Sequence, residues 1–342
     1  VKKNLLHSSL IFILVFLVYF GIGSQWTFQA PLDLDHFNPL AKSFLNGRLD
    51  ISEPATTYDL SFYQGRWYPN WGPLAALLLV PIQLVMGRYV PLFYLNVFIG
   101  SLSVVVIYLL LKRLKKEFLP RLTNGGVLLI TLLFAFGTTH FYLSVNCGVW
   151  HTAQIVSFFP AVLGIYLIFK KRRTMRDYFS SSFFISMTLL GRPVMIGLVA
   201  IPFWLGLWEK EKRGQKLLAL IGPLVFFLIL FGLYNYWRFN QPWETGYRYV
   251  IVNPHYQPWI EEHGIYSLAH LPRNLWHMVF SLPRFVFKDG VRLLFDLDGN
   301  SIFYFSPPLL AAFLALSRRK EIIGLWVSGR IISLPNYLIY ST

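Results

Sequence analysis

The chain has 342 residues, of which 55% are hydrophobic, 18% aromatic and only 14% charged, a composition that excludes an ordinary soluble globular protein. Its net charge of +15 does not indicate nucleic-acid binding, because the Lys and Arg residues stand in short clusters between apolar runs, as in the cytoplasmic loops of membrane proteins. The single cysteine, Cys147, excludes an intrachain disulfide. We predict an all-α, multi-pass bundle of eight to nine membrane helices, in one domain covering residues 1–342.

The apolar runs are assigned to spans by keeping the basic clusters on the cytoplasmic side of the membrane. The first run is predicted to be an uncleaved span, because it is long and lacks a small-residue cleavage site. A long apolar stretch interrupted at Arg192 is predicted to form two short spans that meet there. A last apolar segment begins at Glu321, and we expect the C-terminus to be incomplete. The other spans are predicted at residues 5–23, 91–111, 122–142, 148–169, 217–236 and 301–316.

Residues 24–90 form the first outer loop in this topology. Within it, Asn38-Pro39 predicts a helix start with Asn38 as the N-cap, and Gly47 predicts the end of that helix. The apolar stretch 73–86 is shorter than the ~20 residues that a membrane crossing needs, and a crossing there would place the basic cluster at 112–121 outside. We therefore expect two juxtamembrane helices that form a polar platform between the spans.

Residues 237–300 are predicted to be a second large outer loop, rich in acids and aromatic residues. His263, His270 and His277 follow one another at intervals of seven within it. They lack matching carboxylates in the sequence pattern, so a metal site is not predicted there.

Asp33, Asp35 and His36 stand just before the predicted platform helix. A carboxylate in this position faces free backbone N–H groups and the positive end of the helix, which favours its ionised form. These residues are therefore candidates for a functional site. The alternative is that the acids only cap a short interfacial helix.

Several other polar residues are predicted at the outer ends of the spans. The planar guanidinium of Arg192 suits a phosphate, and the alternative is an arginine that anchors its span in the headgroups. His140, His151 and Gln154 flank the small outer loop 144–147, where they either approach the platform or are hydrogen-bonded structural residues. A sugar or lipid headgroup is one possible ligand of Asn235, Arg238 and Tyr247, and the alternative is a simple aromatic belt.

Taken together, these features resemble the GT-C superfamily of membrane glycosyltransferases, which includes protein O-mannosyltransferases and aminoarabinose transferases. The resemblance rests on a first span, a long outer loop with an early acid, a helix and an apolar juxtamembrane piece. It also rests on five phrases similar to those of uncharacterised bacterial relatives. These are AKSFLNGRLDI, YDLSFYQGRWYPNWGPLAALLLVP, FGTTHFYL with GVWHTAQ, the GRP at 191–193, and YNYWRFNQPWETGY.

The resemblance implies transfer of a sugar from a polyprenyl-phosphate-linked donor to a lipid, glycan or protein hydroxyl, at the outward face of a bacterial plasma membrane. It makes Asp35 or Asp33 the general base. We also expect the protein to contact the surrounding membrane lipids, and we do not expect it to bind nucleic acid. The residues implied to hold the donor phosphate are Arg192, Arg66 and Arg238, and those implied to line the substrate site are His36, Tyr68, His140, His151, Gln154, Asn235 and Tyr247.

The chain departs from the superfamily in its second outer loop, where many relatives carry an acid. No Asp or Glu occurs between Phe118 and Arg176. We therefore expect neither a bound metal nor another cofactor, because a hard ion needs several oxygen ligands. The alternative function is that of a non-enzymatic carrier or assembly protein that binds a lipid or glycan in the same cavity.

Overall fold

The computed structural model describes residues 2–250, 257–264, 267–287, 290–296, 298–307 and 310. These residues are mostly helical. The chain separates into two compact units, residues 1–250 and 251–342, which are described one at a time. The single domain inferred from the sequence stays a prediction.

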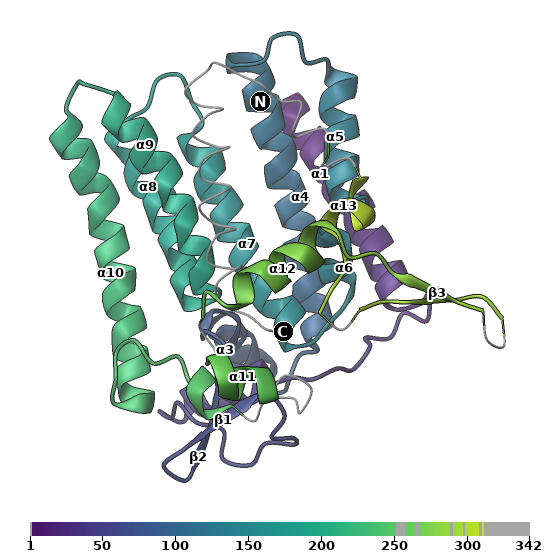
Figure 1. The fold of residues 1–342 in the computed structure, drawn as a ribbon. Helices are drawn as coiled ribbons and strands as arrows, with labels where there is room; N and C mark the ends of the chain where they lie inside the picture. Colours follow the sequence, from purple (N-terminus) through teal and green to yellow (C-terminus); the bar gives the residue numbers. More distant parts are fainter. Residues whose placement is uncertain are drawn as a thin grey trace. The chain divides into compact units, whose positions relative to one another are not determined.

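A row of helices forms the body of the first unit. In this row α1 packs on α4, α4 on α7, α7 on α8 and α8 on α10, so that each helix buries one face against the next (Figure 1). The shorter α5 and α6 pack on α4, and α9 packs on α10. The helices are α1 (Lys2–Gly23), α4 (Leu92–Glu117), α5 (Asn124–Phe136), α6 (Thr139–Val145), α7 (Val149–Ile168), α8 (Met175–Ser186), α9 (Ala200–Trp208) and α10 (Arg213–Phe239).

Four of these helices are long and apolar enough to cross a membrane, as expected for an integral membrane protein. They are Leu5–Gly23, Leu92–Glu117, Val149–Ile168 and Arg213–Phe239, and they coincide with four predicted spans. The pair α5 and α6, bent by 53°, makes a fifth if it is counted as one span. The full number of eight to nine stays a prediction, and most of the predicted C-terminal spans, residues 308–309 and 311–342, lies outside the described residues.

The helical path after α8 breaks at Gly191-Arg192, where the sequence predicts an interruption. The short 3-10 helices η1 (Met187–Leu190) and η2 (Pro193–Val199) flank the break. A Cβ on Gly191 would lie 2.1 Å from Ser157 Oγ of α7, so a larger residue would have to displace the Ser157 hydroxyl. A Cβ on Gly72 would lie 2.4 Å from Leu190 O. The two glycines therefore bring the break close against α7 and the first loop.

The first loop, residues 24–90, contains α2 (Phe37–Leu45) and α3 (Leu74–Met86), which pack on each other. The prediction of Asn38 as N-cap is wrong, because α2 begins at Phe37. The free N–H groups of Phe37 and Asn38 both donate to Asp35 Oδ1, at 3.0 Å, so the carboxylate of Asp35 caps the helix. The predicted end is confirmed: Gly47 has a φ of +67° and its N–H donates to Phe44 O at 3.1 Å.

A β-hairpin between the two helices was not predicted, so the all-α expectation holds only as a mostly helical fold. Strand β1 (Leu60–Tyr63) pairs with β2 (Arg66–Pro69). The turn is Gln64-Gly65 with φ of +48° and +76°, as in a type I′ turn. The hairpin is fastened to the end of α10, since Arg238 Nη1 donates to Pro69 O at 2.6 Å and Ser61 Oγ to Gly246 O at 2.7 Å.

Asn38 holds the first loop together from the inside. Its side chain is fully buried, and its Oδ1 accepts from Gln83 Nε2 of α3 at 2.8 Å and from Val90 N at 3.2 Å. Its Nδ2 donates to Val90 O at 2.9 Å and to Asp35 Oδ2. One amide thus connects the start of α2, the end of α3 and the residues that lead into α4.

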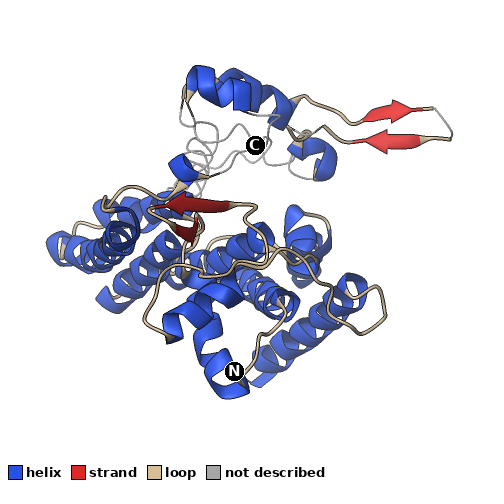
Figure 2. Cartoon of the chain, turned by 90° about the horizontal axis from the view of Figure 1, so that it is seen from below, coloured by secondary structure: helices blue, strands red, loops and turns tan. Residues whose placement is uncertain are grey.

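The second unit contains α11 (Gln257–His263), α12 (His270–Val279), β3 (Arg284–Val286), β4 (Arg292–Leu294) and α13 (Ile302–Phe305). Strands β3 and β4 pair in antiparallel fashion, with Arg284 opposite Leu294. Among the described residues, this hairpin and β1–β2 are the only sheets, drawn in red in Figure 2.

The Asn38 network predicts a large stability effect. We expect Asn38→Leu to lower the free energy of unfolding by about 2–4 kcal/mol. It removes the partners of the Val90 N–H and carbonyl and one of the two acceptors of Gln83 Nε2, which keeps only its bond to Asn38 O. Denaturant unfolding in detergent measures this loss. Asn46→Ala is the control, because its exposed side chain makes one bond at the other end of α2, to Lys42 O. An equal effect of both substitutions would contradict the role given to Asn38.

The length of α3 predicts that this helix does not cross the membrane. Its 13 residues span about 20 Å at 1.5 Å per residue, less than the ~30 Å of bilayer hydrocarbon. With Cys147→Ser as background, we expect a membrane-impermeant maleimide added outside to label Arg88→Cys and spare Lys116→Cys at the far end of α4. Both positions are exposed. Labelling of Lys116→Cys alone would show that α3 crosses the membrane.

Candidate functional site

Segments of the first loop meet the start of α7. Asp33 and His151 both lie against the backbone of Gly148, directly before this helix. A Cβ atom added at Gly148 would be 2.6 Å from Asp33 Oδ2 and 3.4 Å from His151 Nδ1. Gly148 has a φ of +124° and leaves room for both side chains. Cys147 Sγ lies 3.4 Å from Pro31 O, which ties the same two segments together. The structure therefore brings the predicted residues Asp33 and His151 to one place.

Asp35, two residues after Asp33, is fixed by three hydrogen bonds. Its carboxylate accepts the two backbone N–H groups that start α2 and the side-chain amide of Asn38. The ionised form was predicted to be favoured, and this expectation is wrong in its direction. Burial raises the pKa of Asp35, and the three hydrogen bonds, which lower it, only partly offset the burial.

His36 positions the next segment of the loop. Its ring is buried, and because a carbonyl only accepts, Nε2 must carry the hydrogen that it donates to Tyr58 O at 2.8 Å. Burial lowers the pKa of His36. The predicted substrate residue His36 is thus a buried link that sets the position of Tyr58 and its neighbour Asp59.

Asp59 is the functional candidate that the sequence reasoning missed. Its backbone has a φ of +62°, in the left-handed region, and its buried Oδ2 has no hydrogen-bond partner. Burial raises the pKa of this carboxyl to about 6, while a hydrogen bond from the Trp150 side chain lowers it. The one available signal was its membership of the acid-rich first loop. Neither its strained backbone nor its burial can be read from residue types.

The three carboxylates of this cluster lack basic partners. Among the residues that the structure describes, no Lys or Arg forms an ion pair with Asp33, Asp35 or Asp59, whereas Asp50 in the same loop pairs with Arg48. An acid without a fixed counterion is available to take a proton or to bind a polyhydroxyl ligand. We call Asp33, Asp35 and Asp59, with Trp150 and His151, the acidic cluster.

Arg192 lies at a second place, which we call the Arg192 site. Its guanidinium stands over the Trp71 ring, 4.5 Å from the centroid, and the Trp71 and Tyr247 rings meet edge to face at 6.3 Å. In the described part of the chain no carboxylate pairs with Arg192. Trp71 Nε1 and Asn70 Oδ1 are buried without a hydrogen-bond partner, so the polar groups of this site are not fully used.

Helix α7 contacts both the acidic cluster and the Arg192 site. Its Trp150 belongs to the acidic cluster and bonds Asp59. Its Ser157 lies against Gly191, the residue before Arg192. Seven residues on one helix face correspond to about 10 Å along the axis. No hydrogen bond or ion pair between described residues joins Asp35 to Arg192. The acidic cluster and the Arg192 site are therefore separate and are held at a fixed spacing by α7.

Other residues implied by the resemblance lie elsewhere. Arg238 is buried, and its two terminal nitrogens donate to Pro69 O and to Asn235 Oδ1. Tyr68 packs its ring on Phe239, at 5.4 Å. These three predicted residues, Arg238, Asn235 and Tyr68, thus clamp the hairpin to α10, and the exposed Arg66 lies 4.0 Å from Asp50.

His140 has a structural role, and no side-chain hydrogen bond or ion pair between described residues links Gln154 to the acidic cluster. His140 is buried, bonds Gly100 O through Nε2 at 3.1 Å and stacks on Phe134 at 4.5 Å. This is the environment of a structural histidine. Gln154 is half-buried on α7, one turn after Trp150.

In the second unit, the structure brings together one group with metal-ligand character. His277, Asp296 and Asp298 each place a ligand atom within 4.8 Å of the others. The premise that the histidines of this region lack matching carboxylates is therefore wrong for His277. The two acids lie about twenty residues later in the chain and reach it only through the fold.

No family model, no curated protein and no solved structure matches the chain.

The raised pKa of Asp59 predicts how stability depends on pH. Between the ordinary value of 3.8 and about 6, the folded state binds more protons than the unfolded state, so stability falls as pH rises. We expect Asp59→Asn to raise the melting temperature in detergent at about pH 7.5 and to change it little at about pH 4.5. Glu53→Gln, at an exposed acid of the same loop, is the control. A lower melting temperature for Asp59→Asn at the higher pH would contradict the burial argument.

Proposed function

We propose that the chain is a membrane glycosyltransferase of the GT-C type, which passes a sugar from a polyprenyl-phosphate-linked donor to an acceptor hydroxyl at the outward face of a bacterial plasma membrane. The observation that carries the proposal concerns two sites that contact α7: one with carboxylates and a separate one with a guanidinium, none of which forms an ion pair among the described residues. Group transfer from a phosphate ester needs both functions, a base for the acceptor and positive charge for the leaving group.

In the proposed step, the acceptor O–H gives its proton to a carboxylate while its oxygen attacks the anomeric carbon of the sugar. The bond between this carbon and the phosphate oxygen breaks, and its electron pair leaves with the polyprenyl phosphate. Atoms and charges balance without an oxidant, a reductant or a further reactant. The leaving phosphate gains negative charge, which the Arg192 guanidinium stabilises.

Asp35 is the better candidate for the base. A general base works best with a pKa near the working pH and with a fixed orientation. Burial shifts the pKa of Asp35 in this direction, and its three hydrogen bonds fix the carboxylate. Among the described residues, Oδ2 accepts from the Asn38 amide alone, so one of its lone pairs remains for a proton. Asp33 is more exposed and lies by His151, where it is suited to bind the acceptor.

Trp71 gives the Arg192 site its preference for a lipid-linked phosphate. The indole fixes the guanidinium by stacking, and Tyr247 adds a second aromatic wall. A cation set between aromatic rings, on a break between apolar helices, suits an anion that carries a hydrocarbon chain. In this proposal the positive charge comes from arginine, so transfer does not require a bound metal ion.

The test is sugar transfer in membranes that carry single variants. We expect Asp35→Asn to lower the rate by at least about 100-fold, the range lost when a general base is removed. Its Oδ1 still accepts the N–H groups that start α2, but its Nδ2 cannot accept from Asn38 Nδ2 as Asp35 Oδ2 does. The melting temperature of the variant is therefore compared with that of the wild type, and only a loss of rate in folded protein counts. We expect Asp33→Asn to lower the rate less, by about tenfold. Glu53→Gln is the matched control for removal of a charge from the same loop.

The outcomes separate the alternatives. Full activity of both Asp variants would contradict the base assignment. Flux of a lipid or glycan across proteoliposomes, with no covalent product, would favour the non-enzymatic carrier. Loss of activity with EDTA and its return with magnesium or manganese would contradict the arginine-based charge.

A further inference from the structure

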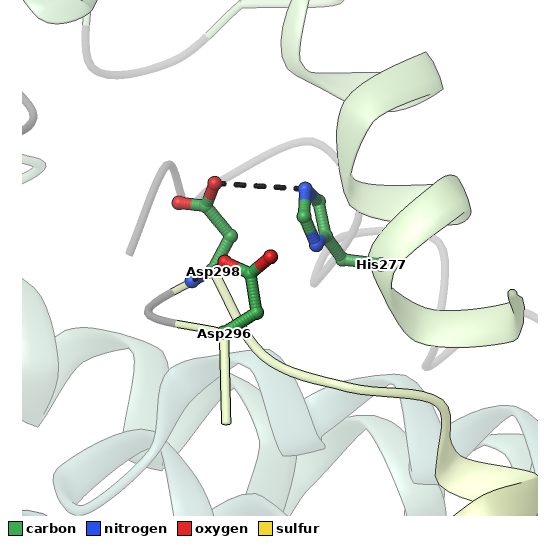
Figure 3. Close-up of side chains that lie close together, drawn as sticks. All are labelled: His277, Asp296 and Asp298. Carbon is green, nitrogen blue, oxygen red and sulfur yellow. Dashed lines mark hydrogen bonds and ion pairs between the residues drawn. The ribbon is translucent and has the colours of Figure 1, made fainter. Parts of the chain in front are cut away.

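The group formed by His277, Asp296 and Asp298 lies within the second unit, and Figure 3 shows how it is arranged. The two carboxylates and the imidazole face one another across a small gap. His277 Nε2 lies 3.5 Å from Asp298 Oδ2, and one ligand atom of each residue falls within 4.8 Å of the other two. Ligand atoms around a single zinc ion are at most about 4 Å apart, since each lies about 2 Å from the metal. The His277–Asp298 pair already meets this limit, and small side-chain movements bring the whole group within it.

Hydrogen bonds hold the two contributing segments together. His277 comes from α12, and the acids come from the segment between β4 and α13. Ser301 N donates to Ser281 O at 2.7 Å, and Ser301 Oγ donates to Val279 O at 2.8 Å. Asn300 Nδ2 donates to Ser281 Oγ at 3.2 Å. These bonds fix the segment that carries Asp296 and Asp298 against the end of α12. The fold of the second unit therefore holds the two acids near His277.

A further hydrogen bond lies within the group itself. The backbone N–H of Asp298 donates to Asp296 Oδ1 at 3.1 Å, which orients the Asp296 carboxylate. Among the described residues, His277 Nδ1 is buried without a hydrogen-bond partner, whereas Nε2 of the same ring lies 3.5 Å from Asp298 Oδ2.

Two arginines already approach the acids. Arg273 Nη2 donates to Asp298 Oδ2 at 2.6 Å, and Arg284 lies 3.6 Å from Asp296 Oδ2. The Asp298 oxygen that Arg273 contacts is also the one that lies 3.5 Å from His277 Nε2, and Asp296 Oδ1 accepts the N–H of Asp298. An ionised carboxylate oxygen has two lone pairs, so a metal ion uses the second one. The arginine charges weaken cation binding but do not occupy all the ligand atoms.

We propose that His277, Asp296 and Asp298 bind one divalent transition-metal ion, with Zn²⁺ as the preferred occupant. One imidazole and two carboxylates are ligands that zinc accepts, whereas magnesium and calcium prefer oxygen alone. Water completes the coordination. The ion joins α12 to the segment after β4 and so stabilises the second unit. The proposal does not depend on the glycosyltransferase function.

The experiment uses the full chain in detergent, purified with a histidine-free tag and stripped with EDTA. Calorimetric titration with Zn²⁺ is expected to show one site per chain. His277→Ala and Asp296→Asn are each expected to weaken binding at least tenfold. The matched control is His263→Ala, which removes a histidine that lies 3.8 Å from a single acid, Glu262, and it is expected to leave the affinity unchanged.

Zinc that binds equally well to the His277→Ala chain, or fails to bind the wild-type chain, would overturn the site. A Co²⁺ titration of the wild-type chain gives a second readout that needs no variant to fold. Visible absorption bands of a four-coordinate ion support the site, and the spectrum of free aqueous cobalt at every ratio overturns it. Neither measurement involves sugar transfer, so failure of the metal site and failure of the proposed function remain distinguishable.

Discussion

The buried amide of Asn38 is the interaction on which the first loop depends. A chain that leaves one apolar helix and enters another must place a polar connection over an apolar bundle, where unpaired backbone groups are costly. Asn38 satisfies Val90 on both its N–H and its carbonyl, accepts from Gln83 and donates to Asp35. Because Asp35 also caps α2, the network that builds the loop also orients the proposed base.

Three glycines allow the first loop and the helices to pack closely against each other. Gly148 admits Asp33 at the start of α7, and Gly72 and Gly191 admit the helix break at the Arg192 site. A larger residue at any of these positions would push apart groups that the proposed reaction needs together. The acidic cluster and the Arg192 site are thus positioned by packing along α7, and in the part of the chain that the structure describes no direct bond links them.

Hydrophobicity and charge in the sequence predicted the four long apolar helices, the short α3 and the break at Arg192, because these features are local and strong. The same reasoning missed β1–β2, although Gln64-Gly65 is a turn signal between alternating residues. It placed Asn38 at the helix start, because a residue's type does not tell whether its amide faces its own helix or the neighbouring segment. Asp59 and the acids near His277 were missed for a related reason: burial and distant neighbours exist only in the fold.

The central claim, that Arg192 and Trp71 receive the phosphate of a lipid-linked sugar, can be tested directly by photo-crosslinking. A photoreactive polyprenyl phosphate is activated in membranes, and the labelled peptides are mapped by mass spectrometry. The account predicts labelling of the peptides that contain Trp71 and Arg192, with competition by unlabelled polyprenyl phosphate and at least a tenfold loss in Arg192→Ala. Labelling of these peptides that is unchanged in Arg192→Ala, or label found only in other peptides, would contradict it.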